Sequence, residues 1–262
     1  MSFDWPFFWQ RLTDPGSIYY VALGRTVAMA VLAMLLGILI GVIVGFGRLS
    51  RFRVVRAVCY FYVWLIRGIP VLVLLVFFFS GLAAAGLFRF QDISVAGLTL
   101  SGSFQAAVIG LAIHEGAYMA EIVRNGIQAV ARGQIEAAKS IGMSTWALTR
   151  RIVLPQATRV IVPPLGNDFN HILKTTSLAS VIGVQEIFQL TESLSATTFK
   201  TFELLIALSI TYLVLTSAWN VIQGVIETKL RAHELDASVS TWRGALVHYV
   251  RAGTLHENER RS

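Results

Sequence analysis

Charged residues, cysteines and metal-ligand clusters are all scarce in this sequence, and each shortage excludes a class of protein. Only 14% of the 262 residues are charged, whereas soluble domains carry about 25%. The single cysteine, Cys59, excludes an intrachain disulfide. The five histidines are scattered and form no metal-ligand spacing. We therefore expect neither a soluble domain, nor a disulfide scaffold, nor a metal site.

Motifs of nucleotide binding and hydrolysis are also missing. No G-x-x-x-x-G-K-[ST] loop occurs, so the chain does not bind ATP by that route. His114 and Glu115 are not followed by the second histidine of an H-E-x-x-H site, and there is no G-x-S-x-G nucleophile elbow. We expect a chain that is not an enzyme and holds no cofactor. The N-terminus lacks a basic segment before an apolar one, which argues against a cleaved signal peptide.

Apolar residues make up 55% of the chain, and the mean hydropathy is +0.64. This composition predicts an integral membrane protein. The net charge of +7 would suit a nucleic acid or a membrane surface. Because the arginines cluster beside apolar segments, we expect membrane lipid and no nucleic acid as a partner.

The apolar segments predict an all-α fold with about five transmembrane helices, because about 20 apolar residues cross the hydrocarbon core. The expected spans are 26–47, 58–88, 104–127, 160–182 and 204–226. The second span is expected to bend where Gly68 and Pro70 follow Arg67. Arg67 is read either as an anchor at the membrane surface or as part of a cytoplasmic contact. In the first span Gly37, Gly41 and Gly45 share one face, which permits close helix approach.

Arginine-rich loops set the expected topology. The loop over 48–56 has four arginines and no acid, and the region after the third span is also basic. These loops are expected in the cytoplasm, which places the N-terminus outside and the C-terminus inside. The expected domains are an N-terminal interfacial segment (1–19), a permease domain (20–228, with a loop at about 128–155) and a cytoplasmic tail (229–262). The aromatic residues of 1–19 favour an interfacial helix over a disordered terminus. An amphipathic stretch in the tail suits a membrane surface or a partner.

Polar side chains inside the third span are candidates for a transport pathway, because ionisable groups within membranes usually face a bundle interior or a cavity. The third span carries His114, Glu115 and Glu121. Glu115 and Glu121 lie on different faces of a helix, and Glu121 is expected to pair with an arginine or with the loop. His114 and Glu115 either read the charged groups of a solute or are hydrated residues of a pore.

The fourth span is weakly apolar and cannot face lipid, so we expect it to line the pathway from inside the bundle. Its pathway candidates are Asn167, Asp168, Lys174, Thr175, Thr176 and Ser177. Lys174 could bind a carboxylate of the solute or form an internal salt bridge. The salt bridge is favoured, because buried charges are normally paired.

One polar, basic stretch interrupts the apolar sequence. It begins with a helix-forming segment, continues through Gly142 and a second helical segment over 144–154, and Pro155 is expected to end or bend that segment. The spacing resembles the EAA loop of ABC importer permeases: Glu136-Ala137-Ala138, three residues, Gly142, nine residues, then Ile152-x-Leu154-Pro155. Four further blocks, at 67–70, 117–127, 163–167 and 174–178, resemble the polar amino acid subfamily of the histidine, glutamine, arginine and glutamate type.

This resemblance covers about 20–228 and implies the type I importer fold in a bacterial inner membrane. It assigns the ATPase-coupling role to Glu136, Ala137, Ala138, Gly142, Ile152, Leu154 and Pro155. It also implies three partners: a cytoplasmic ATPase dimer that binds ATP and Mg, a second permease subunit (identical or paralogous), and an extracytoplasmic solute-binding protein. The alternatives are a permease for an opine or compatible solute, a gated channel, and an intramembrane enzyme.

Overall fold

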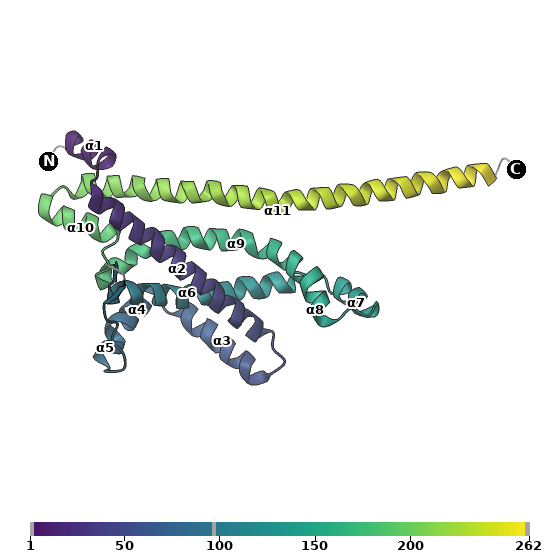
Figure 1. The fold of residues 1–262 in the computed structure, drawn as a ribbon, viewed down its shortest axis with the longest axis horizontal. Coiled ribbons are helices and arrows are strands. Elements are labelled where there is room, and N and C mark those ends of the chain that lie inside the picture. Colours follow the sequence, from purple (N-terminus) through teal and green to yellow (C-terminus); the bar gives the residue numbers. More distant parts are fainter. Residues whose placement is uncertain (1–2, 96–97, 260–262) are drawn as a thin grey trace. The chain divides into compact units, whose positions relative to one another are not determined.

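The computed structural model describes residues 3–95 and 98–259, with side chains only up to residue 230 and not at 95 and 98. The amphipathic stretch predicted in the tail therefore lies outside the described side chains. The chain divides into two compact units, Met1–Trp219 and Asn220–Ser262. The helices are α1 (Trp5–Thr13), α2 (Ser17–Arg48), α3 (Arg53–Gly68), α4 (Val71–Val76), α5 (Leu82–Ala84), α6 (Gly102–Gln128), α7 (Arg132–Ser140), α8 (Thr145–Leu148), α9 (Leu154–Thr175), α10 (Ile187–Thr198) and α11 (Thr201–Glu259) (Figure 1).

Three helices among the described residues are long and apolar enough to cross a membrane: Ser17–Arg48, Gly102–Gln128 and Thr201–Leu230 of α11. They match the first, third and fifth predicted spans, and the prediction of an integral membrane protein is confirmed. The predicted fourth span is present as α9, which is helical over 22 residues but falls short of that apolar test. Its polar side chains and two internal prolines account for this, as the sequence suggested.

The second predicted span is broken at the expected place. α3 and the α4–α5 segment are bent by 104° between Gly68 and Val71, and together they pass the apolar test. Pro70 has no N–H to continue the α3 hydrogen-bond ladder, so the helix ends before it. A π-helical segment, Phe77–Gly81, joins α4 to α5. The bend is confirmed, and its size makes this pair a broken span or a re-entrant loop rather than one straight helix.

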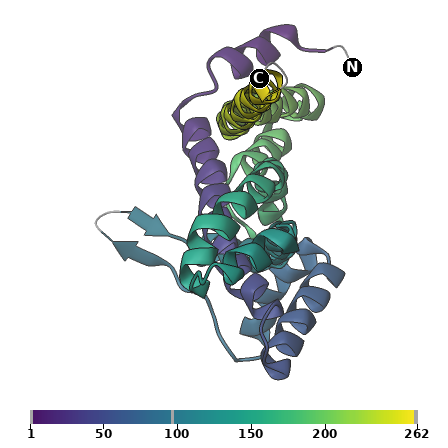
Figure 2. The ribbon, with the colours of Figure 1, turned by 90° about the vertical axis from the view of Figure 1, so that its right-hand side faces the viewer.

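A small hairpin occupies the loop between α5 and α6. Strands β1 (Ile93–Val95) and β2 (Leu98–Leu100) pair antiparallel, with Ser94 opposite Thr99. The hairpin projects to one side of the helices (Figure 2). The Asp92 carboxylate accepts a hydrogen bond from the Gly102 N–H at 2.8 Å, which joins the loop to the start of α6. Strands of three residues are too short to leave a readable alternation in the sequence.

The core is built around α6, and α2 packs directly along it. A Cβ added at Gly37 would lie 2.9 Å from the Cβ of Glu115, and one added at Gly41 would lie 2.2 Å from the Cβ of Met119. Only glycine allows the two backbones to approach this closely. The predicted close approach of the glycine face is therefore confirmed, and α6 is its partner.

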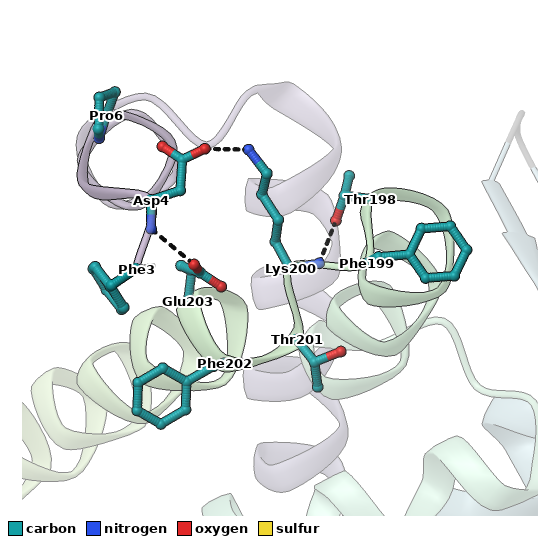
Figure 3. A pocket seen from close by; sticks show the side chains of 9 residues that line it. All are labelled: Phe3, Asp4, Pro6, Thr198, Phe199, Lys200, Thr201, Phe202 and Glu203. Carbon is teal, nitrogen blue, oxygen red and sulfur yellow. Dashed lines mark hydrogen bonds and ion pairs between the residues drawn. The ribbon is translucent and has the colours of Figure 1, made fainter. Parts of the chain in front are cut away.

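The N-terminal segment forms a helix, α1, as the aromatic pattern predicted. Asp4 caps this helix by accepting the Phe7 N–H at 3.0 Å, and its carboxylate also forms an ion pair with Lys200. The hydrogen bond from Lys200 lowers the pKa of the Asp4 carboxyl. The Asp4 N–H donates to Glu203 at 2.9 Å. A pocket of about 870 Å³ lies here (Figure 3), lined by Phe3, Asp4, Pro6, Thr198, Phe199, Lys200, Thr201, Phe202 and Glu203. It contains none of the predicted pathway residues.

Candidate functional site

The polar stretch after α6 folds as two short helices that meet at Gly142, as the sequence predicted. Gly142 has φ +78°, the left-handed conformation that glycine adopts without strain. Its N–H donates to the Lys139 carbonyl at 3.0 Å, and the Met143 N–H donates to the Ala138 carbonyl at 3.1 Å. Ser144 then caps α8 by accepting the Ala147 N–H at 3.3 Å. We call residues Arg132–Leu148 the coupling element.

A small apolar cluster under the coupling element holds it together. Val130, Ala138, Leu148 and Val153 form the cluster, and Ile152 packs against it. Ala138 is 4% exposed, so it faces this cluster and not a partner. Ala138 is the one buried residue of α7, and its ATPase-coupling role stays a prediction.

The outward face of the coupling element carries Glu136, Ala137 and Gly142, which are all exposed. Two large apolar residues that were not predicted also lie on this face: Ile141 is 78% exposed and Trp146 is 71% exposed. The sequence feature that could have identified them is the presence of two large apolar side chains inside an otherwise polar segment. Glu136 forms no ion pair within the part of the chain that the structure describes. This face therefore carries a charged side chain and exposed apolar side chains that do not serve the packing of the subunit itself.

Pro155 does not end the helical segment in which it lies. A π-helical segment, Thr149–Val153, follows α8 directly, and the Leu154 N–H donates to the Thr149 carbonyl. Pro155 lies in the first turn of α9, directly after this π-helical segment, whose wider turn accommodates a residue without an N–H. The chain is thus helical without interruption from Thr145 to Thr175. Leu154 and Pro155 are exposed at the start of α9.

Glu121 is surrounded by arginines at the coupling-element end of α6. It forms ion pairs with Arg48 and, at 2.6 Å, with Arg124, while Arg67 lies at 3.8 Å. The pairing expected from the sequence is confirmed. Arg67 also lies over the Tyr118 ring, 4.9 Å from its centroid. These contacts fasten the ends of α2, α3 and α6 to one another.

A second polar cluster lies between α6 and α9, with Glu115 buried and His171 exposed at its edge. The Glu115 side chain is 2% exposed, and its Oε1 lies 3.2 Å from His114 Nδ1 and 4.0 Å from His171 Nδ1. Asp168, three residues before His171, is near enough for the charges of Glu115 and His114 to act on it. We call these four residues the interior cluster. His171 was not among the predicted site residues, although its spacing from Asp168 on α9 was a signal.

The remaining pathway candidates take different places. Asn167 and Lys174 are exposed and, with His171, share one face of α9. The hydroxyls of the three residues after Lys174 donate to backbone carbonyls of their own helix: Thr175 to His171 at 2.9 Å, Thr176 to Leu173 at 2.8 Å and Ser177 to Lys174 at 2.8 Å. These hydroxyl protons are therefore already engaged in hydrogen bonds within the chain.

The salt bridge favoured for Lys174 is not found, since Lys174 has no acidic partner among the described side chains. Its position on the outward face of α9 explains this. Lys174 and Ser177 instead line a hollow of about 290 Å³ beside Tyr212. No group of three potential metal ligands occurs in the described part of the chain.

Different elements lie at the two ends of the first unit, Met1–Trp219. The turn between α2 and α3 and the coupling element lie toward one end, and α1 and α10 lie toward the other (Figure 1). The arginine-rich loop over 48–56 is therefore on the same side as the coupling element, as the sequence predicted.

Comparison with known proteins identifies related chains. Residues 37–232 match the family model of the binding-protein-dependent transport system inner membrane component. The arginine transport system permease protein ArgU of Corynebacterium glutamicum is 42% identical over 207 residues, which are 78% of this chain and 65% of that protein. The glutamine transport system permease protein GlnP of Escherichia coli K12 is 31% identical over 231 residues, or 88% of this chain and 99% of that one.

A solved structure shares the same fold. The crystal structure of an amino acid ABC transporter with histidines contains a chain that is 31% identical, with a TM-score of 0.76. The match covers 87% of this chain and 100% of that one. The type I importer fold expected from the EAA spacing is confirmed by this match.

Proposed function

Because this chain belongs to the family of inner membrane components of binding-protein-dependent transport systems, we propose that it is the permease subunit of an ATP-driven importer of polar amino acids. The observation that carries the proposal is the outward face of the coupling element. It presents Ala137, Ile141 and Trp146 at one end of the unit, on a self-supporting corner at Gly142. The names of ArgU and GlnP support the amino acid class, whereas the nopaline transport system permease protein NocM of Agrobacterium fabrum, 37% identical over 199 residues, is named for an opine. None of these three names refers to a compatible solute or a channel.

The coupling element docks in a groove of a cytoplasmic ATPase, which binds ATP and Mg. The permease itself catalyses no reaction and holds no cofactor. When the ATPases close, they displace α7. The displacement passes through the continuous helical path from Thr145 to Thr175, because nothing in that path is a flexible loop. α9 carries half of the interior cluster, so the docking surface and the pathway are joined by one helix.

The other partners follow from the remaining surfaces. A second permease subunit, identical or paralogous, faces the exposed polar residues Asn167, His171 and Lys174 of α9 and completes the pathway. An extracytoplasmic solute-binding protein approaches the end that holds α1, α10 and the hairpin. The arginine-rich loops place the coupling element and the C-terminus in the cytoplasm, with the N-terminus outside.

The test is co-purification of the ATPase with an Ala137→Arg variant. Ala137 is exposed on α7, so the change enlarges the docking face without entering the apolar cluster. The matched control is Ser193→Arg, an equally large change at an exposed site of α10. We expect the wild type and Ser193→Arg to retain the ATPase and Ala137→Arg to lose it. Equal retention by all three, or no ATPase with the wild type, overturns the proposal.

Nucleotide dependence separates the importer from a channel. In proteoliposomes that contain the complete transporter and its binding protein, uptake of a radiolabelled polar amino acid should require ATP inside the compartment that holds the ATPase. Flux that continues without nucleotide would instead support the gated channel.

A further inference from the structure

The first turns of α2 carry an arginine at the edge of the apolar span. Residues 26–47 of α2 contain no charged side chain, and Arg25 and Arg48 stand directly before and after them. At about 1.5 Å per residue this stretch is about 33 Å long, which matches the thickness of the hydrocarbon core, about 30 Å. Arg25 therefore lies at the level of the lipid headgroups. The buried Thr26 hydroxyl accepts the Ile187 N–H at 3.2 Å, which fixes this end of α2 against α10.

Arg25 has hydrogen-bond partners but no counter-charge. Its Nη1 donates to the main-chain carbonyl of Gln185 at 3.2 Å and lies 3.4 Å from the side-chain Oε1 of the same residue. Within the described side chains no acid forms an ion pair with Arg25, whereas Arg48, at the other end of the span, pairs with Glu121. The N–H donors on Nε and Nη2 of Arg25 make no hydrogen bond to the described residues. A full positive charge and three of the five guanidinium donors are thus free to bind a ligand.

A hollow of about 410 Å³ opens beside Arg25, between α2 and α10. Its volume falls in the range of small-molecule sites, about 300–1,000 Å³. Ile18 and Val21 form an apolar wall and share one face of α2 with Arg25, and all three side chains are exposed. Gln185 and Gln189 form a polar wall on the opposite side. None of the described side chains that line the hollow is acidic.

We infer that this hollow binds the headgroup of an anionic phospholipid, with the phosphate on Arg25 and an acyl chain along Ile18 and Val21. A guanidinium binds phosphate oxygens through two parallel N–H bonds, and basic pockets beside transmembrane helices are suited to such headgroups. A zwitterionic lipid fits less well, because no carboxylate in the lining can pair with its cation. A free phosphate would leave the apolar wall in water, whereas a lipid covers it. The inference requires only that α2 spans the membrane, and not that the protein transports amino acids.

The test is photo-crosslinking of phosphatidylglycerol that carries a diazirine on its acyl chain, added to the protein purified in detergent with the subunits that accompany it. The adducts are located by peptide mass spectrometry. Arg25→Gln removes the charge, and Gln189→Glu supplies the acid that the hollow lacks. The control is Arg89→Gln, which removes an equal charge at an exposed site outside the hollow. We expect the wild type and the control to be labelled within 17–25 or 185–193, and both hollow variants to be labelled about fivefold less.

Competition identifies the ligand. Unlabelled phosphatidylglycerol should suppress the labelling in the hollow, and phosphatidylcholine or inorganic phosphate at the same concentration should suppress it much less. Equal suppression by phosphatidylcholine would show that the net charge of the lipid does not matter, and equal suppression by inorganic phosphate would assign the site to a free anion. Either result overturns the inference. Equal labelling of the wild type and both hollow variants also overturns it, as does a wild type without adducts in the hollow, which is the result expected if a second subunit covers this surface.

Discussion

At the scale of single residues, the glycines of α2 make the sharpest prediction. Replacing Gly41 with valine puts a Cβ within 2.2 Å of the Met119 Cβ, so α2 and α6 must separate. Overpacking of this kind costs about 1–3 kcal/mol. The melting temperature of the detergent-solubilised protein, followed by fluorescence, should fall. The control is Gly24→Val, because a Cβ at Gly24 meets nothing within 4 Å. Equal melting temperatures for the two variants would contradict this packing.

Residue-scale predictions succeeded where residue type and spacing alone decide the outcome. The spacing of Gly37, Gly41 and Gly45 predicted a close helix contact, and a lone acid among arginines predicted the pairing of Glu121. Predictions failed where the result depends on which face of a helix turns inward. Lys174 is exposed on α9, and the sequence alone did not show which of its polar residues would turn inward.

At the scale of elements, the corner at Gly142 sets the direction of α7. An alanine there must adopt φ +78°, which costs a residue with a Cβ about 1–2 kcal/mol. We expect Gly142→Ala to increase proteolysis between α7 and α8 and to weaken ATPase binding. Gly133→Ala is the control, since Gly133 lies in the same segment with open space around it and no positive φ. Similar proteolysis of the two variants would show that the corner does not depend on glycine.

α10 is held in place by a buried acid that the sequence analysis did not single out. Glu186 is fully buried and caps α10 by accepting the Gln189 N–H at 2.8 Å. Thr26 of α2 and Tyr212 of α11 also lie within 3.3 Å of its carboxylate. Three elements therefore meet at one side chain, and all its donors are neutral. Burial raises the pKa of Glu186 above its ordinary value of 4.5.

This raised pKa predicts a pH dependence of stability. Between its ordinary and its raised pKa, Glu186 binds more protons in the folded than in the unfolded state. Its contribution is thus complete below the ordinary value and is lost as pH rises through the raised one. The melting temperature should increase as pH falls through the raised pKa toward the ordinary value of 4.5, and Glu186→Gln should flatten that slope. Glu192→Gln, on the same helix but exposed, should keep it. An equal slope in both variants would assign the effect to other groups.

Element predictions were good for long apolar helices and poor for short or irregular ones. Segments of about 20 predominantly apolar residues leave few alternatives to a spanning helix, so α2, α6 and the start of α11 were predicted closely. The β1–β2 hairpin and the π-helical passage from α8 into α9 depend on one or two local hydrogen bonds. Proline alone suggested an end at Pro155, because nothing in the sequence marks the wider π turn that accommodates it.

At the scale of the whole molecule, the sequence predicted which loops share a side and which membrane face they occupy. The structure supports the first point, since the α2–α3 turn and the coupling element lie toward the same end (Figure 1). The residues that form the pathway are harder to predict from one sequence than the topology is. Glu115, Asp168 and His171 come from segments far apart in the chain, and only the packing of α9 on α6 brings them together.

Membrane orientation is the last prediction, and the chain suits a cysteine-labelling test. With Cys59 replaced by serine, the protein has no thiol, and single cysteines can report on each side. We expect Ser193→Cys on α10 to react with an impermeant maleimide in intact cells. Arg51→Cys, in the α2–α3 turn, should react only after the membrane is opened. Both sites are exposed, so a difference in labelling reports sidedness and not burial. The reverse pattern would put the arginine-rich loop and the coupling element outside, where no ATPase could reach them, and would refute the proposed coupling.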